Sequence, residues 1–315
     1  MIVVSSATSG YVMPLAVMMR SLLAYHTGPP PVRFFVVDLG LDGDERLRLE
    51  QQCATGGAGL QWIRLEATRF AGLPNWRGMH PGTYSRLFLP QFLPPESSRA
   101  IWLDADMVLQ ADCGELWGAP FHDQALLAAQ DLVIPYVSSR YGVAEYRRLG
   151  LPPEAKYFNA GVMVVNLDWW RRQAVTGRVL DHLREARDRV YFYDQEGLNA
   201  VLCGQWGELD PRWNQIAGVA GRRFLRVRHL PADKYREVVE RPWLVHFAGS
   251  WKPWNLHPQS AARALYFHYL DQTGWAGWRP PPSWSGFLRG VYDRRLRDFL
   301  YPLEHWGMRL LQRWG

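Results

Sequence analysis

In the stretch "AIWLDADMVLQ", residues 100–110, two aspartates interrupt an otherwise apolar, strand-like run. Burying an unpaired carboxylate is costly, so such a residue pairs with a cation, becomes neutral or lies where a strand meets solvent. A strand points every second residue to the same face, so Asp104 and Asp106 would lie side by side and bind one metal ion. An exposed loop at a strand end is an equal alternative on these residues alone.

A second Asp-x-Asp pair, formed by Asp42 and Asp44, occurs in "LGLDGDERLRLE" (39–50). Gly43 and the charged, helix-periodic residues that follow are typical of a turn and a helix start. This pair is therefore predicted to cap a helix.

Apolar, strand-like runs alternate with helical or turn-rich stretches along the chain. They are the opening residues, "VRFFVVDLG" (32–40), "LQWIRLE" (60–66), "AIWLDADMVL" (100–109), "ALLAAQDL" (125–132) and "AGVMVVNLD" (160–168). This alternation predicts an α/β fold with a mostly parallel sheet, in which ligands bind at the carboxyl ends of strands.

Composition bounds the class of protein. The chain has 315 residues, 48% of them hydrophobic, and a net charge of +6 from 33 arginines and three lysines. Basic excess favours anionic ligands, but no nucleic-acid-binding motif is present and we expect no nucleic-acid partner. Three cysteines without C-x-x-C spacing favour a reducing compartment. Residues 1–26 lack the basic start of a signal peptide and predict a strand, a turn and a helix, so we expect a cytoplasmic protein.

Composition shifts after residue 255, which predicts a catalytic domain over 1–255 and a helical, proline-interrupted region over 256–315. "WRPPPSWSG" (278–286) is a proline-rich connector, and 287–314 places apolar residues on one helical face with six arginines elsewhere. Residues 284–315 would then bind an anionic membrane surface, peripheral on the inner face of the cytoplasmic membrane. A terminal helix docked on its own domain is the equal alternative, because periodicity does not separate the two.

Four further stretches accompany the aspartate pair. They are "GTYSRLFLPQFLP" (82–94), "YFNAGVMVVNLDWWRR" (157–172), "DQEGLNAVLCGQWGELDPRWN" (194–214) and "VHFAGSWKPWN" (245–255). With "IWLDADMVL" they resemble, in order, glycosyltransferase family 8, the group of glycogenin and the bacterial lipopolysaccharide galactosyl- and glucosyltransferases. The resemblance implies a Rossmann-like, nucleotide-binding fold of the GT-A type and a retaining, metal-dependent transfer from UDP-sugars.

Carried over onto this chain, the resemblance implies that Asp104, Asp106 and His246 bind Mn²⁺, with Mg²⁺ as the alternative. Two carboxylates and one imidazole suit manganese better than magnesium, which prefers an all-oxygen shell. Lys252 would contact the β-phosphate, and Gly249 would let backbone N–H groups approach it.

The same resemblance implies a donor-binding set around the nucleotide and the sugar. Its members are Ala7, Thr8, Tyr11, Arg86, Asp104, Ala105, Asp131, Asn159, Ala160, Asp194, Gln195, Gly249 and Lys252. Tyr11 would stack on the base. Thr8 stands where bacterial members usually carry an aspartate for the uracil edge, whereas glycogenin-like members have a threonine in that neighbourhood.

Gln195, Asp194 and Arg86 are the predicted catalytic residues. An amide oxygen is a poor nucleophile beside a carboxylate, so Gln195 favours front-side transfer over double displacement. For Asp194, a helix N-cap is the structural alternative.

The sequence thus predicts a hexosyltransferase that moves glucose or galactose from a UDP-sugar to a saccharide or glycolipid acceptor such as lipopolysaccharide. A catalytically silent nucleotide-sugar or glycan-binding protein is the alternative, and a metal-dependent nucleotidyltransferase is a third hypothesis. Four arginines in 215–240, namely Arg222, Arg223, Arg226 and Arg228, would belong to an acceptor-side lid or to a solvated basic face.

Overall fold

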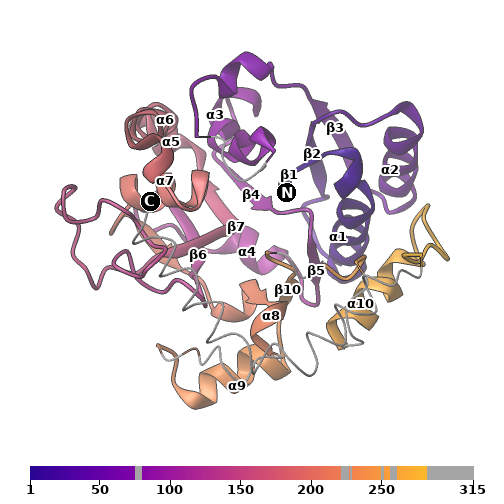
Figure 1. Ribbon diagram of the computed structural model, residues 1–315. Coiled ribbons are helices and arrows are strands. Elements are labelled where there is room, and N and C mark those ends of the chain that lie inside the picture. The colour runs from indigo at the N-terminus through magenta and orange to yellow at the C-terminus, as the bar shows by residue number, and fades with distance from the viewer. Residues whose placement is uncertain (75–79, 221–226, 228, 250–251, 256–260, 282–315) are drawn as a thin grey trace.

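The computed structural model describes residues 1–74, 80–220, 227, 229–249, 252–255 and 261–281. Its centre is a seven-stranded sheet (Figure 1). In spatial order the strands are β3 (Gly59–Ile63), β2 (Arg33–Asp38), β1 (Ile2–Ala7), β4 (Arg99–Leu103), β7 (Phe158–Asn166), β6 (Leu126–Gln130) and β8 (Trp206–Glu208). All neighbours pair in parallel except β7, which runs antiparallel to both β4 and β6. The predicted mostly parallel α/β fold is therefore confirmed.

Short 3-10 helices and longer α-helices connect the strands. The α-helices are α1 (Val12–Tyr25), α2 (Gly43–Thr55), α3 (Leu89–Phe92), α4 (Gly114–Gly118), α5 (Leu167–Arg172), α6 (Val175–Ala186), α7 (Tyr193–Val201), α8 (Ala217–Ala220), α9 (Ala232–Glu240) and α10 (Ala261–Leu270). The 3-10 helices are η1 (Ser9–Tyr11), η2 (Ala67–Phe70), η3 (Pro81–Phe88), η4 (Arg187–Arg189) and η5 (Pro211–Asn214). At the start of α2, Asp42 accepts from Glu45 N in a capping box, as predicted for this aspartate pair.

The strand period of two sorts the core onto two faces of the sheet. Val3 and Ile101 pack with α1 and α2, whereas Val4 and Trp102 pack with α6 and α7. Figure 1 shows these two groups of helices on opposite sides of the molecule. Both faces are covered, which explains why apolar residues occupy successive positions in the middle of these strands, such as Val3 and Val4 of β1 and Ile101 and Trp102 of β4.

A second, three-stranded sheet lies beside the first, in the order β5 (Met107–Leu109), β10 (Leu244–His246) and β9 (Gln215–Ile216). The apolar run 100–109 is thus two strands in two sheets rather than one strand. Asp104 and Asp106 lie in the turn between β4 and β5, so the prediction that they share one strand face is wrong. A turn lets the chain leave the large sheet and join the small one, and it also leaves both carboxylates at the strand ends.

Helix α10 packs against α1 through a small apolar cluster that includes Val17 and Tyr266. Cys53 and Cys113 are buried and all three cysteines are free. None of the helices in the described residues is both long and apolar enough to cross a lipid bilayer. The predicted membrane-binding segment 284–315 and the arginines of the predicted lid lie outside the described residues.

Candidate metal and donor-binding site

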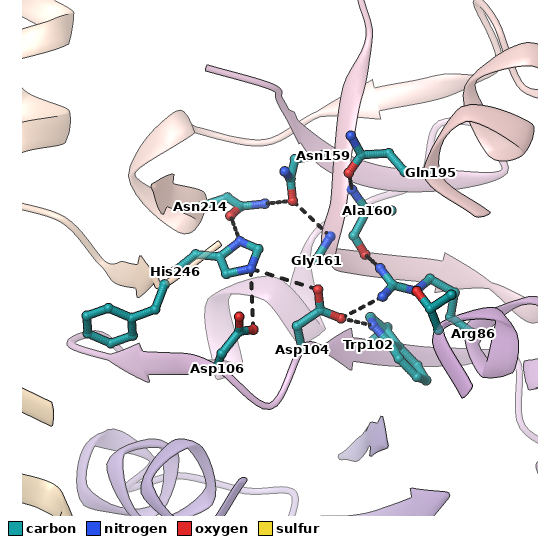
Figure 2. A network of polar contacts seen from close by, with 12 residues as sticks. Arg86, Trp102, Asp104, Asp106, Asn159, Ala160, Gly161, Gln195, Asn214 and His246 are labelled. Atoms are coloured by element: carbon teal, nitrogen blue, oxygen red, sulfur yellow. Dashed lines mark hydrogen bonds and ion pairs between the residues drawn. The ribbon is translucent and has the colours of Figure 1, made fainter. Parts of the chain in front are cut away.

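Three predicted metal ligands converge where the two sheets meet. Asp104, Asp106 and His246 each offer a ligand atom, and these atoms all lie within 4.8 Å of one another. His246 Nε2 lies 3.5 Å from Asp106 Oδ1 and 3.8 Å from Asp104 Oδ2. Figure 2 shows both carboxylates on the Nε2 side of the imidazole. Asp106 and His246 are buried, and Asp104 is partly open to solvent.

Strand pairing produces this convergence from distant parts of the chain. Asp104 N donates to Gly161 O (2.9 Å), which extends the β4–β7 ladder by one residue beyond Leu103. In the small sheet, Phe247 N donates to Asp106 O (2.9 Å) and His246 pairs with Met107. Each ligand is thus fixed by a main-chain hydrogen bond on itself or on its neighbour.

Gly161 of β7 permits the close approach of the imidazole. A Cβ at this position would lie 2.5 Å from His246 Cε1 and 2.9 Å from Met107 Cε, and both distances are shorter than the contacts that Cβ atoms make in proteins. The sequence prediction took Asn159 and Ala160 from the "FNAG" motif and missed this glycine, whose role depends on contacts across the two sheets.

The donor atoms fit a divalent metal ion. One imidazole with two carboxylates is a mixed nitrogen and oxygen set, which suits manganese, whereas magnesium prefers oxygen alone. His246 Nδ1 is engaged by Asn214 Oδ1 at 2.9 Å, which leaves Nε2 facing the carboxylates. A nitrogen lone pair and two carboxylate oxygens that face the same position can together bind one metal ion.

Arg86 of η3 contacts both Asp104 of the metal group and Asp194 of α7. Its Nη2 donates to Asp104 Oδ1 (2.8 Å), its Nη1 donates to Ala160 O (2.6 Å), and its Nε lies 2.8 Å from Asp194 Oδ2. The guanidinium also lies over the ring of Trp102, 5.0 Å from its centroid. Burial alone would lower the pKa of Arg86, but the two carboxylates raise it above its usual value.

Asp194 lies within the first turn of α7 and is not its N-cap, since the cap residue is Phe192 and carries no capping side chain. Its carboxylate accepts from Thr83 Oγ1 (2.9 Å) and faces Arg86. Burial raises the pKa of Asp194, and the charge of Arg86 opposes that rise. The helix-cap alternative for Asp194 is therefore wrong.

Lys252 contacts the metal group through Asp106. Its ammonium pairs with Asp106 Oδ2 and donates to Phe247 O (2.8 Å). Burial opposes ionisation of Asp106, yet Lys252 and His246 hold its pKa well below the usual range. Lys252 Nζ also lies 5.5 Å from the ring centroid of Tyr11, whose ring packs edge-on against Trp254.

Predicted sugar-binding side chains form a second cluster beside Arg86. Asn159 Nδ2 donates to Asp131 Oδ2 (2.8 Å), and Gln195 Nε2 lies 3.4 Å from the same oxygen. Gln195 Oε1 accepts from Ala160 N (3.0 Å), so this amide is held against β7 (Figure 2).

The remaining predicted donor-binding residues lie around these clusters. Ala7 ends β1 and Ala105 lies buried between the two aspartates. Thr8 precedes η1 without a capping hydrogen bond, and Gly249 follows β10 with φ +75°. Within the described part of the chain, no hydrogen bond or ion pair links Thr8 or Gly249 to the metal group.

Glu196, which the sequence prediction passed over, holds the turn before α7. Its carboxylate accepts from Ala144 N (2.8 Å), Tyr191 N (2.5 Å) and Phe192 N (3.3 Å). Tyr193, which follows Phe192 and begins α7, adopts φ +43°, which is unusual for a residue with a bulky side chain. The buried carboxylate thereby fixes the strained entry into the helix that carries Asp194 and Gln195.

Glu196 is expected to make folding stability depend on pH. Burial raises its pKa to about 7, although the backbone N–H donors oppose the rise. Because the folded state then binds the proton more tightly than the unfolded chain, this contribution is complete below about pH 4.5 and is lost as pH rises through about 7. Urea unfolding of Glu196→Gln should therefore show a shallower fall in midpoint from about pH 5 to about pH 8 than the parent. Parallel profiles would contradict this assignment.

The fold and the site together define a GT-A-like glycosyltransferase architecture. The chain superposes on galactosyltransferase LgtC, solved in complex with donor and acceptor sugar analogues, with a TM-score of 0.75 and 24% identity, covering 91% of this chain and 99% of that one. It also superposes on the bifunctional glycosyltransferase WbbM, with a TM-score of 0.74 and 21% identity, over 87% of this chain and 50% of that one.

The family model for glycosyl transferase family 8 matches residues 2–257, and the chain belongs to that family. General stress protein A of Bacillus subtilis is 29% identical over 87% of this chain and 94% of its own length. Glycosyltransferase GlyF of Streptococcus pneumoniae is 22% identical over 85% of this chain and 61% of its own length. Glycosyl transfer is the activity of this class.

Proposed function

We propose that the protein is a retaining, Mn²⁺-dependent transferase that moves glucose or galactose from a UDP-sugar to a saccharide or glycolipid acceptor such as lipopolysaccharide. The observation that carries the proposal is the group formed by Asp104, Asp106 and His246, whose ligand atoms lie within 4.8 Å of one another at a strand end. Family membership supports glycosyl transfer, and the mixed ligand set supports manganese.

The divalent ion, Lys252 and Tyr11 would each interact with the nucleotide part of the donor. When bound, the divalent ion supplies positive charge to the diphosphate as the glycosidic bond breaks. Lys252, whose burial is offset by its pairing with Asp106, has a raised pKa and stays cationic beside the same position. Its ammonium adds electrostatic stabilisation of the departing UDP. Tyr11, partly exposed beside Lys252, offers a face for the base.

The sugar would lie against Asp131, Asn159 and Gln195, whose carboxylate and amides match hydroxyl groups. Gln195 Oε1 already accepts a hydrogen bond from Ala160 N, and Asp194 is paired with Arg86. Neither residue is thereby free to act as a strong nucleophile, which favours front-side transfer, with the leaving phosphate assisting deprotonation of the acceptor hydroxyl. Arg86 would hold Asp104 and Asp194 on either side of the donor.

The direct test is release of UDP from UDP-glucose and UDP-galactose, with MnCl₂, MgCl₂ or EDTA, in the presence of several saccharide and glycolipid acceptors. We expect manganese-stimulated release with one of the two donors, and an α-linked product from these α-configured sugar nucleotides. No release from either donor would contradict the proposal. Tight UDP-sugar binding without turnover would favour the silent binding protein, and transfer of a nucleotidyl group would favour a nucleotidyltransferase.

The arginine- and aromatic-rich segment 284–315 is proposed to hold the enzyme on the inner face of the cytoplasmic membrane, where glycolipid acceptors are accessible. The proposal rests on the pattern of its residues, because the segment lies outside the described part of the chain. A chain ending at residue 280 should keep UDP-sugar hydrolysis but sediment less with anionic vesicles. The 315-residue chain with the six arginines of 284–315 changed to glutamine should do the same, with neutral vesicles as the control. Unchanged sedimentation of both would contradict it.

A further inference from the structure

A continuous chain of hydrogen bonds links the predicted sugar subsite to the predicted metal ligand. Asp131 Oδ2 accepts from Asn159 Nδ2 (2.8 Å), Asn159 Oδ1 accepts from Asn214 Nδ2 (2.9 Å), and Asn214 Oδ1 faces His246 Nδ1 (2.9 Å). All four side chains are at least nine-tenths buried. Figure 2 shows Asn214 between Asn159 and the imidazole of His246, with the carboxylates of Asp104 and Asp106 on the other side of the ring. We call this series the relay.

The Asp131 end of the relay determines which group donates and which accepts in every one of its hydrogen bonds. Ionised Asp131 can only accept, so the amide of Asn159 must turn its NH₂ group toward it. Gly161 N can only donate, and it donates to Asn159 Oδ1 at 2.9 Å, which fixes the same orientation independently. Asp131 is itself held as an acceptor by Val133 N (2.7 Å) and Ile134 N (2.8 Å).

This orientation passes through Asn214 to the imidazole. Because Asn159 Oδ1 is an acceptor, Asn214 must present its NH₂ to Asn159 and its oxygen to His246. His246 Nδ1 must then carry a proton, and Nε2 is the nitrogen left to offer a lone pair to an ion between Asp104 and Asp106. An imidazole with the opposite tautomer would place a lone pair against the oxygen of Asn214 and an N–H where the ion belongs.

The register of the small sheet places Asn214 for this contact. Asn214 ends η5 directly before β9, and β9 pairs in parallel with β10 so that Ile216 lies beside His246. The residue before β9 is therefore carried alongside the imidazole. Asn214 is 2% exposed and does not belong to the metal group itself.

We infer that Asn214 is a positioning residue, which through the relay from Asp131 and Asn159 holds His246 in the Nδ1–H tautomer required for metal binding. The inference rests on the proposed function, since it assumes that His246 binds the ion. Hydrogen-bond partners of metal-binding histidines of this kind change metal affinity by about 10- to 100-fold when removed.

The first test needs no metal. Long-range ¹H–¹⁵N spectra of the apo protein at pH 8.5 should show the His246 signal, assigned by its loss in His246→Gln, with a proton on Nδ1. An unprotonated Nδ1 would overturn the inference. This result is independent of whether the parent protein binds manganese or transfers sugar.

The second test is the affinity for MnCl₂ alone, measured by the electron paramagnetic resonance signal of free Mn²⁺. Asn214→Leu should weaken binding by about 10- to 100-fold. The matched control is Asn199→Leu, because Asn199 is equally buried but bonds to the main chain of Phe158 and Gln195 instead. Asn199→Leu should lose stability while keeping the manganese affinity.

The outcomes separate the two proposals. Equal affinity of the parent and Asn214→Leu for manganese, in folded protein, would overturn the positioning role while leaving the metal-dependent function intact. A parent that binds no manganese would overturn the metal dependence of the proposed function, and the tautomer measurement would then decide the relay alone.

Discussion

Asp106→Asn is expected to lower manganese-stimulated turnover of UDP-sugars by about 10³-fold, because metal charge stabilisation is worth several kcal/mol and each 1.36 kcal/mol is tenfold in rate. The substitution preserves shape but removes the charge that Lys252 and His246 both face. Turnover should be measured as UDP release over a range of MnCl₂ concentrations, with unfolding measured in parallel.

The matched control is Asp168→Asn, an aspartate on α5 that is half exposed and, within the described part of the chain, pairs only with Arg171 one turn away. It should leave turnover and its manganese dependence unchanged. Undiminished turnover in Asp106→Asn would remove this carboxylate from the proposed metal group. Equal losses in both variants would indicate a general effect of charge rather than a ligand role.

Arg86→Met is expected to lower the free energy of unfolding by about 3 to 5 kcal/mol, the usual cost of breaking a buried ion pair from one side. Arg86 and Asp194 are both buried, and the variant leaves the Asp194 carboxylate without its cationic partner while Thr83 still donates to it. Urea unfolding at neutral pH gives the measurement.

A double-mutant cycle identifies the cause. Adding Asp194→Asn to Arg86→Met should recover part of the lost stability, because the uncompensated charge is removed. Arg148→Met is the comparison, since Arg148 pairs with Glu145 and Glu185 at the surface and its loss should change stability only slightly. Additive effects of the two site substitutions would contradict a direct pair between Arg86 and Asp194.

Much of this architecture follows from local pattern. The alternation of apolar strands and helices predicted the sheet, because strand and helix periods are local properties of the sequence. The helix cap at Asp42 was predicted for the same reason, whereas its capping box with Glu45 was seen only in the structure. The run 100–109 was misjudged as one strand, because apolar residues on both sides of Asp104 and Asp106 are equally compatible with two strands in different sheets.

The candidate site, too, could be predicted only in part from the sequence. Asp104, Asp106 and His246 were predicted from motifs, and the structure brings them together. Asn214, Gly161 and Glu196 were missed, since an asparagine beside a histidine, a glycine beneath it and a glutamate on loop N–H groups depend on contacts between distant segments. For Asn214, the tryptophan–asparagine ending of "ELDPRWN" offered no chemical signal before the parallel pairing of β9 and β10 was known.

The meeting of the two sheets at the aspartate turn has a mechanical consequence. The small sheet has little support of its own, because β9 has two residues and β10 and β5 have three each. An ion shared by Asp104, at the carboxyl end of β4 in the large sheet, and His246, in the small one, would cross-link them. Cofactor loading and ordering of the small sheet would then be thermodynamically linked, each favouring the other.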